Sequence, residues 1–238
     1  MLLTQISGSP AVWWKAPSVD WVLGNLDLIA SLTLDHLRLS LIPIVIGVLI
    51  AIPLGWLAHR FAWSRSIILT AVGLLYTIPS LALFMLIPPL VGISVLSEAN
   101  VIIALTVYAV AIMVRTASDA FASIEPTSLR AATALGYAEW GRFFSVELPL
   151  AGPVLLAGVR VVAVSTVSMV TVGVLVGVQS LGYFFTDGFQ RRILAEVATG
   201  VVMTVVIALL LDALLILLGR LLMPWSRVSV APPRLGVR

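Results

Sequence analysis

The chain has 238 residues, of which 61% are apolar and only 11% are charged. Because soluble globular domains carry about 25% charged residues, this composition indicates a membrane protein. Cysteine is absent, which excludes disulfides and thiolate metal sites, and His36 and His59 lie too far apart in sequence to suggest a local metal motif. The net charge of +3 comes from residues scattered between apolar segments, so the sequence predicts no nucleic-acid partner.

Apolar segments long enough to cross a membrane recur along the chain. About 20 apolar residues cross roughly 30 Å of hydrocarbon, so five spans with their connections use nearly all of the sequence. We therefore predict an all-α membrane protein with a transmembrane domain over residues 37–223, a cytoplasmic loop at 119–150 and a cytoplasmic tail at 224–238. The predicted spans are residues 38–58, 67–91, 100–117, 152–178 and 197–219.

Basic residues indicate how these spans are oriented. Five spans put the two termini on opposite faces, and a cytoplasmic C-terminus places ten of the 14 basic residues inside, as the positive-inside tendency favours. The inner ten are Arg60, Arg65, Arg115, Arg130, Arg142, Arg160, Arg220, Arg227, Arg234 and Arg238, and the outer four are Lys15, Arg38, Arg191 and Arg192.

The first 36 residues mix tryptophans with charged residues, which suits the membrane interface better than its interior. We expect an interfacial helix near residues 19–33. A cleaved signal peptide is the alternative, but the segment lacks a basic start, a following apolar run and a small-residue cleavage site. The residues that carry this reading are Trp13, Trp14, Lys15, Asp20, Trp21 and Asp27.

Prolines interrupt the first two spans, and glycines are frequent in the fourth. A proline frees a backbone carbonyl, which in lipid must be satisfied by a neighbouring helix or by water in a cavity. Helix packing alone explains such breaks; the alternative is that Thr77 and Pro79 open the second span toward a solute pathway faced by Ser165, Thr166 and Thr171. The pathway residues that we predict are Tyr76, Ser80, Tyr108 and Ser168.

Two charged residues, Arg160 and Asp212, fall inside predicted spans. Intramembrane charges are costly enough that each needs a partner or water. At about 1.5 Å per residue, both lie roughly 12–14 Å from the cytoplasmic ends of their helices. We predict that they approach each other between the fourth and fifth spans, whereas the alternative is that Arg160 reaches the headgroups alone.

A polar segment, residues 128–153, reads SLRAATALGYAEWGRFFSVELPLAGP within this otherwise apolar chain. Pro126 can start a helix that Gly136 stops, and a second helix over 138–147 is expected to end at Pro149. An ordinary solvated hairpin explains the helix caps, but it does not explain two adjacent phenylalanines near Leu135 and Tyr137. The segment therefore predicts a rigid docking surface for a soluble partner.

The spacing within this segment is specific: Ala131-Ala132, three residues, Gly136, nine residues, Val146, one residue, then Leu148-Pro149. It resembles the EAA loop of ABC importer permeases, whose pattern is E-A-A, three residues, G, nine residues, I, one residue, L-P. Arg130 stands where the pattern has glutamate, which reverses the charge. The resemblance implies docking to an ATPase through Ala131, Ala132, Leu135, Gly136, Tyr137, Phe143, Phe144 and Pro149.

The resemblance extends over about residues 36–200 and narrows toward permeases for osmoprotectants such as glycine betaine, carnitine, choline and proline. Permeases for methionine, taurine and nitrate share the loop and the five-span core, so they stay as alternatives. Near the end of the fourth span, VGVQSLGYF resembles the family's GAGGLG element, with Gln179 and Ser180 at positions that are usually small or glycine. The matching stretches are 36–40, 52–55, 76–93, 147–160 and 176–184.

The resemblance implies the type I ABC importer core in a bacterial cell membrane. It also implies two permease subunits, identical or related, two cytoplasmic ATPases that bind ATP and Mg, and an external substrate-binding protein or lipoprotein. The chain lacks a G-x-x-x-x-G-K-[ST] phosphate loop, so we expect it to bind no cofactor and to catalyse no reaction itself. An ion-driven secondary transporter and a membrane-embedded enzyme are the alternatives, for which we find little support in the intramembrane residues.

Overall fold

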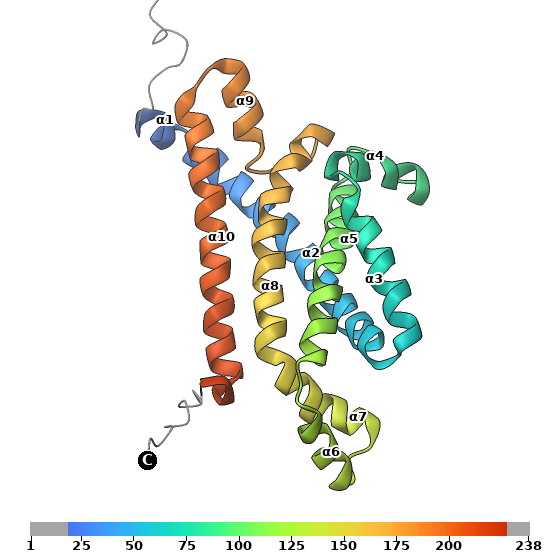
Figure 1. Cartoon of the computed structure of the whole chain (residues 1–238). Coiled ribbons are helices and arrows are strands. Elements are labelled where there is room, and N and C mark those ends of the chain that lie inside the picture. Colours follow the sequence, from blue (N-terminus) through green and yellow to red (C-terminus); the bar gives the residue numbers. More distant parts are fainter. Residues whose placement is uncertain (1–18, 228–238) are drawn as a thin grey trace, which may run out of the picture.

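The structure is a computed structural model that describes residues 19–227, and these residues form helices joined by short connections (Figure 1). Expectations for Trp13, Trp14, Lys15, Arg234 and Arg238 lie outside the described residues. The helices are α1 (Val19–Gly24), α2 (Leu26–Arg60), α3 (Ala62–Thr77), α4 (Ser80–Val91), α5 (Glu98–Ala122), α6 (Pro126–Ala134), α7 (Glu139–Arg142), α8 (Leu148–Val170), α9 (Tyr183–Arg191) and α10 (Leu194–Leu222).

Four helical stretches are long and apolar enough to cross a membrane, and α3 with α4 makes a fifth if the bent pair is one span. The four are α2, α5, α10 and a continuous run over Glu139–Val176 that contains α8. This result confirms the prediction of an all-α membrane protein with about five spans. Of the short helices, α1 precedes α2, α6 and α7 follow α5, and α9 lies between α8 and α10 (Figure 1).

The N-terminal expectation was wrong in its detail, because no separate helix covers residues 19–33. The helix α1 has six residues and stops at Asn25, whose side-chain amide donates to the Trp21 carbonyl at 2.7 Å. The helix α2 then starts at Leu26 and runs for 35 residues, so the expected domain boundary at residue 36 falls inside it. Its length of about 52 Å exceeds the bilayer core, and it lies obliquely across the bundle (Figure 1).

The second predicted span, residues 67–91, is not one straight helix. The chain bends by 108° between α3 and α4, where Ile78 takes an extended conformation before Pro79. A proline disfavours helical geometry in the preceding residue, which accounts for the position of the break. Consequently α3 runs along α5 while α4 lies across one end of the bundle (Figure 1).

Close contact between α2 and α5 forms the centre of the bundle. A Cβ atom at Gly47 would lie 2.5 Å from the Ala109 Cβ, and one at Gly55 would lie 2.4 Å from the Ala117 Cβ. Small residues on both helices thus bring the two backbones together, as is common between membrane helices. This contact fixes the C-terminal end of α2 beside the polar segment that follows α5.

The two ends of the bundle differ in character. One end holds α6, α7 and the end of α10, where the Trp225 indole donates to the Pro149 carbonyl at 3.3 Å. The opposite end holds α1, α4 and α9 (Figure 1). The helix α9 was not predicted, because its nine residues are too few and too polar to stand out among the apolar spans. The polar segment and the end of α10 therefore share one face.

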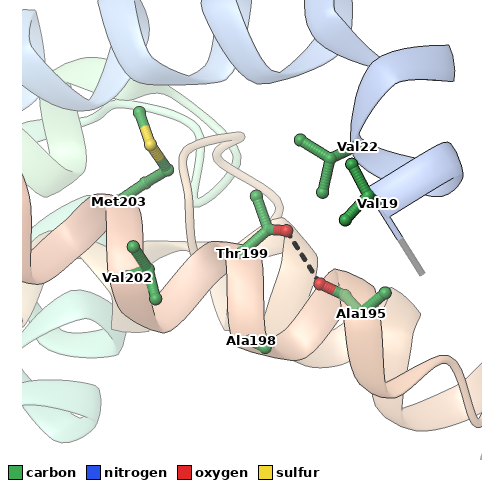
Figure 2. A pocket seen from close by; sticks show the side chains of 7 residues that line it. All are labelled: Val19, Val22, Ala195, Ala198, Thr199, Val202 and Met203. Atoms are coloured by element: carbon green, nitrogen blue, oxygen red, sulfur yellow. Dashed lines mark hydrogen bonds between the residues drawn. The ribbon is translucent and has the colours of Figure 1, made fainter. Parts of the chain in front are cut away.

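A cavity of about 290 Å³ lies between α1 and α10 (Figure 2). Its one hydroxyl group, that of Thr199, donates to the Ala195 carbonyl within α10 at 2.7 Å. The remaining wall is aliphatic apart from one thioether, so we do not assign a binding site here. The lining residues are Val19, Val22, Ala195, Ala198, Thr199, Val202 and Met203.

Candidate functional site

The polar segment between α5 and α8 folds into a compact unit that we call the knob (residues 126–147). Its first helix, α6, has Pro126 in the first turn and ends at Ala134, two residues before Gly136, where φ is +84°. The Gly136 amide donates to the Thr133 carbonyl, and the Tyr137 amide donates to the Ala132 carbonyl at 3.2 Å. This pattern is a Schellman cap, in which glycine takes the left-handed conformation at the helix end.

The second half of the knob does not end at Pro149, which corrects that expectation. The helix α7 passes through a π-helical turn at Phe143–Glu147 directly into α8. The Leu148 amide donates to the Phe143 carbonyl, five residues back, instead of four. Pro149 has no amide hydrogen to donate, and it directly follows this widened turn. The helix therefore continues through the proline.

The knob presents an apolar surface outward. The side chains of Trp140 and Phe144 are 68% and 61% exposed, and their rings stack with centroids 6.5 Å apart. Leu135 and Tyr137 are also exposed, at the turn between the two helices. Apolar groups gathered on the polar end of a membrane protein indicate a partner surface. Sequence reasoning missed Trp140, although its position beside Phe144 was a usable signal.

Phe143 does not belong to this surface, contrary to expectation, because its side chain is only 7% exposed. Its ring lies 5.2 Å from the Trp56 ring and 5.9 Å from the Phe121 ring. Ala132 is likewise buried, whereas Ala131 is exposed. Phe143 therefore anchors the knob to α2 and α5, and Phe144 is the phenylalanine that a partner can reach.

Polar contacts brace the knob against the end of α2. The buried Glu147 carboxylate accepts from Arg142 Nε at 2.7 Å and from Trp56 Nε1 at 2.9 Å. Arg60, the last residue of α2, pairs with Glu139 in α7. Because these contacts join the second half of the knob to one long helix, we expect a displacement of the knob to move the end of α2. Sequence reasoning missed Trp56, Arg60 and Glu147 as site residues.

Arg130 lies at the rim of a pocket of about 450 Å³ on the knob. Its side chain is exposed, and it forms no ion pair with any residue that the structure describes. Arg142, on the same pocket, is by contrast paired with Glu147. The pocket thus carries an excess of positive charge. Its other lining residues are Leu129, Thr133 and Ala134.

The predicted pathway residues separate into structural and exposed positions. Tyr108 is buried, and its hydroxyl donates to the Ile78 carbonyl at the break before Pro79. This contact satisfies a carbonyl at the bend, so Tyr108 supports the bend and is not open to a pathway. The Tyr76 ring meets the Tyr108 ring edge-on at 6.1 Å and is itself exposed. Ser80 is partly buried and Ser168 is exposed.

The structure brings Arg160 and Asp212 together in a two-point contact. Arg160 Nε lies 2.6 Å from Oδ1 and Nη2 lies 2.9 Å from Oδ2 of the aspartate. The two helices run antiparallel here, and Gly219 lets Leu156 approach α10 closely on the side toward the knob. In residues 19–227, no group of three or more histidine, aspartate or glutamate side chains could hold a metal ion.

The model of the family described as "Binding-protein-dependent transport system inner membrane component" matches residues 36–228. The chain belongs to this family. The permease is 32% identical over 203 residues to the osmoprotectant import permease protein OsmW of Salmonella typhimurium, covering 83% of this chain and 93% of OsmW. It is 29% identical to the choline transport system permease protein OpuBB of Bacillus subtilis, covering 81% and 87% of the two chains.

Among solved structures, the permease resembles a chain of the MetNI methionine ABC transporter in inward facing conformations. The TM-score is 0.70 at 22% identity, with 85% of this chain and 97% of that chain covered. This likeness establishes the fold of the type I ABC importer permease. The chain is thus an inner-membrane permease subunit of an ABC importer, a machine that also includes an ATPase and a substrate-binding protein.

Proposed function

We propose that this permease imports osmoprotectants such as glycine betaine, carnitine, choline or proline. The support is that OsmW, OpuBB and the glycine betaine/carnitine/choline permease OpuCB of Bacillus subtilis align over 80% or more of the chain at 27–32% identity. Permeases for methionine, taurine or nitrate are the second candidates. The likeness to MetNI does not favour them, because at 22% identity it concerns the fold alone.

We also propose that the knob couples ATP hydrolysis by the partner ATPases to transport. The observation that supports this mechanism is the braced knob with its exposed aromatic surface. ATP and Mg bind the partner ATPases, whose closure moves the knob, and the spans then reorient between inward and outward access. A ligand shifts a conformational equilibrium only if it binds the two states differently, so the knob must fit the open and closed ATPases differently. The contacts of Trp56, Arg60 and Glu147 transmit the displacement to α2.

Uptake by the reconstituted importer tests the substrate class. With its ATPase and binding protein in vesicles, the permease is expected to accumulate labelled glycine betaine or choline only when ATP is present. Excess unlabelled osmoprotectant should compete, whereas excess methionine, taurine and nitrate should not. Competition by methionine alone would replace the osmoprotectant proposal, and uptake driven by an ion gradient without ATP would favour a secondary transporter.

The remaining partners and the orientation are also proposals. A second permease subunit, identical or related, completes the membrane part, an external binding protein or lipoprotein delivers the solute, and lipid surrounds the spans. The Trp225 contact to Pro149 supports a common face for the knob and the end of α10. If ATPases bind the knob, this face is cytoplasmic, and so is the C-terminus.

Arg130 gives a test of the partner's charge. We propose that an acidic side chain of the ATPase meets this arginine, so Arg130→Glu should weaken ATPase binding by about tenfold, or about 1.4 kcal/mol. Arg130→Lys should retain most of the affinity, and the difference should shrink at high salt. Binding is measured by titrating labelled ATPase onto the detergent-solubilised permease. Equal affinities of the three chains at low salt would contradict the proposal.

A further inference from the structure

The paired helices α8 and α10 have two unlike faces. On one face, a cavity of about 310 Å³ is lined wholly by aliphatic side chains of α2, α8 and α10. Val159, Ala163 and Leu214 are among them. The other face has a pocket of about 480 Å³ lined by Ala157, Arg160, Val161, Val164, Ser165 and Asp212. The intramembrane ion pair therefore belongs to one face alone.

The charged pocket lies deep in the expected membrane. Arg160 is 12 residues into α8 and Asp212 is ten residues from the end of α10, which corresponds to about 15–18 Å along each helix. These depths are near the middle of a hydrocarbon core of roughly 30 Å. Arg160 does not extend toward the headgroups alone, because two of its nitrogens contact Asp212.

The ion pair is only partly shielded by the rest of the chain. The side chains of Arg160 and Asp212 are 39% and 24% exposed. Contact between such groups and hydrocarbon is costly, so charged side chains inside membranes face the bundle interior or a water-filled cavity. Val161, Val164 and Ser168 continue the exposed stripe along α8. Contact with lipid is therefore unfavourable for this face, whereas the aliphatic face can contact lipid.

We infer that this face of α8 and α10 lines a water-filled solute pathway, with Arg160 and Asp212 as a fixed pair of opposite charges on its wall. The inference rests on the proposed function, since it assumes that the chain moves a solute. Arg160 contacts Asp212 through Nε and Nη2, which leaves Nη1 for a carboxylate or water. A small zwitterion, with one carboxylate and one ammonium group, is the class of solute that such a wall complements.

The absence of cysteine allows a direct test, because each introduced thiol is the only one in this chain. Val161→Cys reports on the charged face, where the native side chain is 57% exposed. Leu214→Cys is the matched control, since Leu214 lies near the same depth, is 49% exposed and lines the aliphatic cavity. Both variants are assembled with the ATPase and treated with a membrane-impermeant, sulfonate-bearing methanethiosulfonate.

Val161→Cys is expected to react at least about tenfold faster than Leu214→Cys, because a thiolate forms readily in water and poorly in an apolar environment. Saturating glycine betaine should slow the reaction of Val161→Cys about threefold or more, and glycerol at the same concentration should not. Equal, slow labelling of both positions would mean a lipid-facing surface and would overturn the inference.

Slow labelling with efficient oxidative cross-linking between two Val161→Cys subunits would mean a dry interface between permeases, which also overturns the inference. Fast labelling without protection by glycine betaine would overturn the assignment of a zwitterion. Failure of the proposed function is distinguishable, because it appears as absence of ATP-driven glycine betaine uptake by the wild-type importer, independently of either labelling rate.

Discussion

Gly136→Pro is expected to abolish ATP-driven uptake while the permease still inserts in the membrane. Gly136 has a φ of +84° and donates its amide to the Thr133 carbonyl, whereas proline requires a φ near −65° and has no amide hydrogen. The turn between α6 and α7 must therefore change. We expect a loss of uptake of about a hundredfold, which corresponds to roughly 3 kcal/mol.

Two variants control for this change. Gly141→Ala lies in α7 of the same knob, and its added Cβ would meet the nearest atom, Tyr137 Cδ1, at an ordinary 3.7 Å. It should leave uptake within about twofold, because the backbone there is already helical. Gly136→Asn should be intermediate, since asparagine tolerates the left-handed conformation better than other residues. Normal uptake by Gly136→Pro would show that the turn between α6 and α7 does not couple the ATPase to transport.

Glu147→Ala should loosen the knob and lower the stability of the permease by about 3 kcal/mol. The Glu147 carboxylate accepts from Arg142 and from Trp56, and the side chains of Arg142 and Glu147 are both largely buried. Removing the carboxylate leaves the indole without its acceptor and a largely buried guanidinium without its charged partner, although Arg142 Nη1 still donates to the Thr133 hydroxyl. The effect is measured as a lower temperature of unfolding in detergent, together with reduced uptake at equal amounts of protein.

Glu139→Ala is the matched control, because it also removes a carboxylate that pairs with an arginine across the knob. Glu139 and its partner Arg60 are much more exposed, so the cost should stay below about 1 kcal/mol. Glu147→Gln should be intermediate, since an amide oxygen can still accept from Trp56. If Glu139→Ala and Glu147→Ala destabilised the chain equally, the buried brace would not be the structural feature that holds the knob.

The sequence was sufficient for the features that depend on local spacing. The helix stop at Gly136 followed from residue type, because glycine is the usual residue at a left-handed helix end. The apolar stretches likewise predicted α5 and α10 with errors of a few residues. The prolines indicated a bend in the second span, and the structure confirms one before Pro79, but hydropathy did not predict its angle of 108°.

Features that depend on distant contacts could not be predicted in this way. Trp56 and Glu147 are 91 residues apart in sequence, and their contact depends on how α2 packs against α5. Phe143 and Phe144 are adjacent and equally apolar, yet one is buried and the other exposed. Phe143 is the buried one because its ring packs against Trp56 of α2 and Phe121 of α5, and the sequence does not show which side of α7 meets these helices. The brace of the knob was therefore visible only in the fold.

Purification of the tagged permease from its native membrane, with mass spectrometry of bound proteins, is the most direct test of the knob as the ATPase docking surface. The wild-type chain should retain a nucleotide-binding ATPase, and Gly136→Pro should lose it while Gly141→Ala keeps it. An osmoprotectant-binding protein in the wild-type sample would also support the proposed substrates. Recovery of no ATPase with the wild-type chain, or equal recovery with Gly136→Pro, would contradict the account.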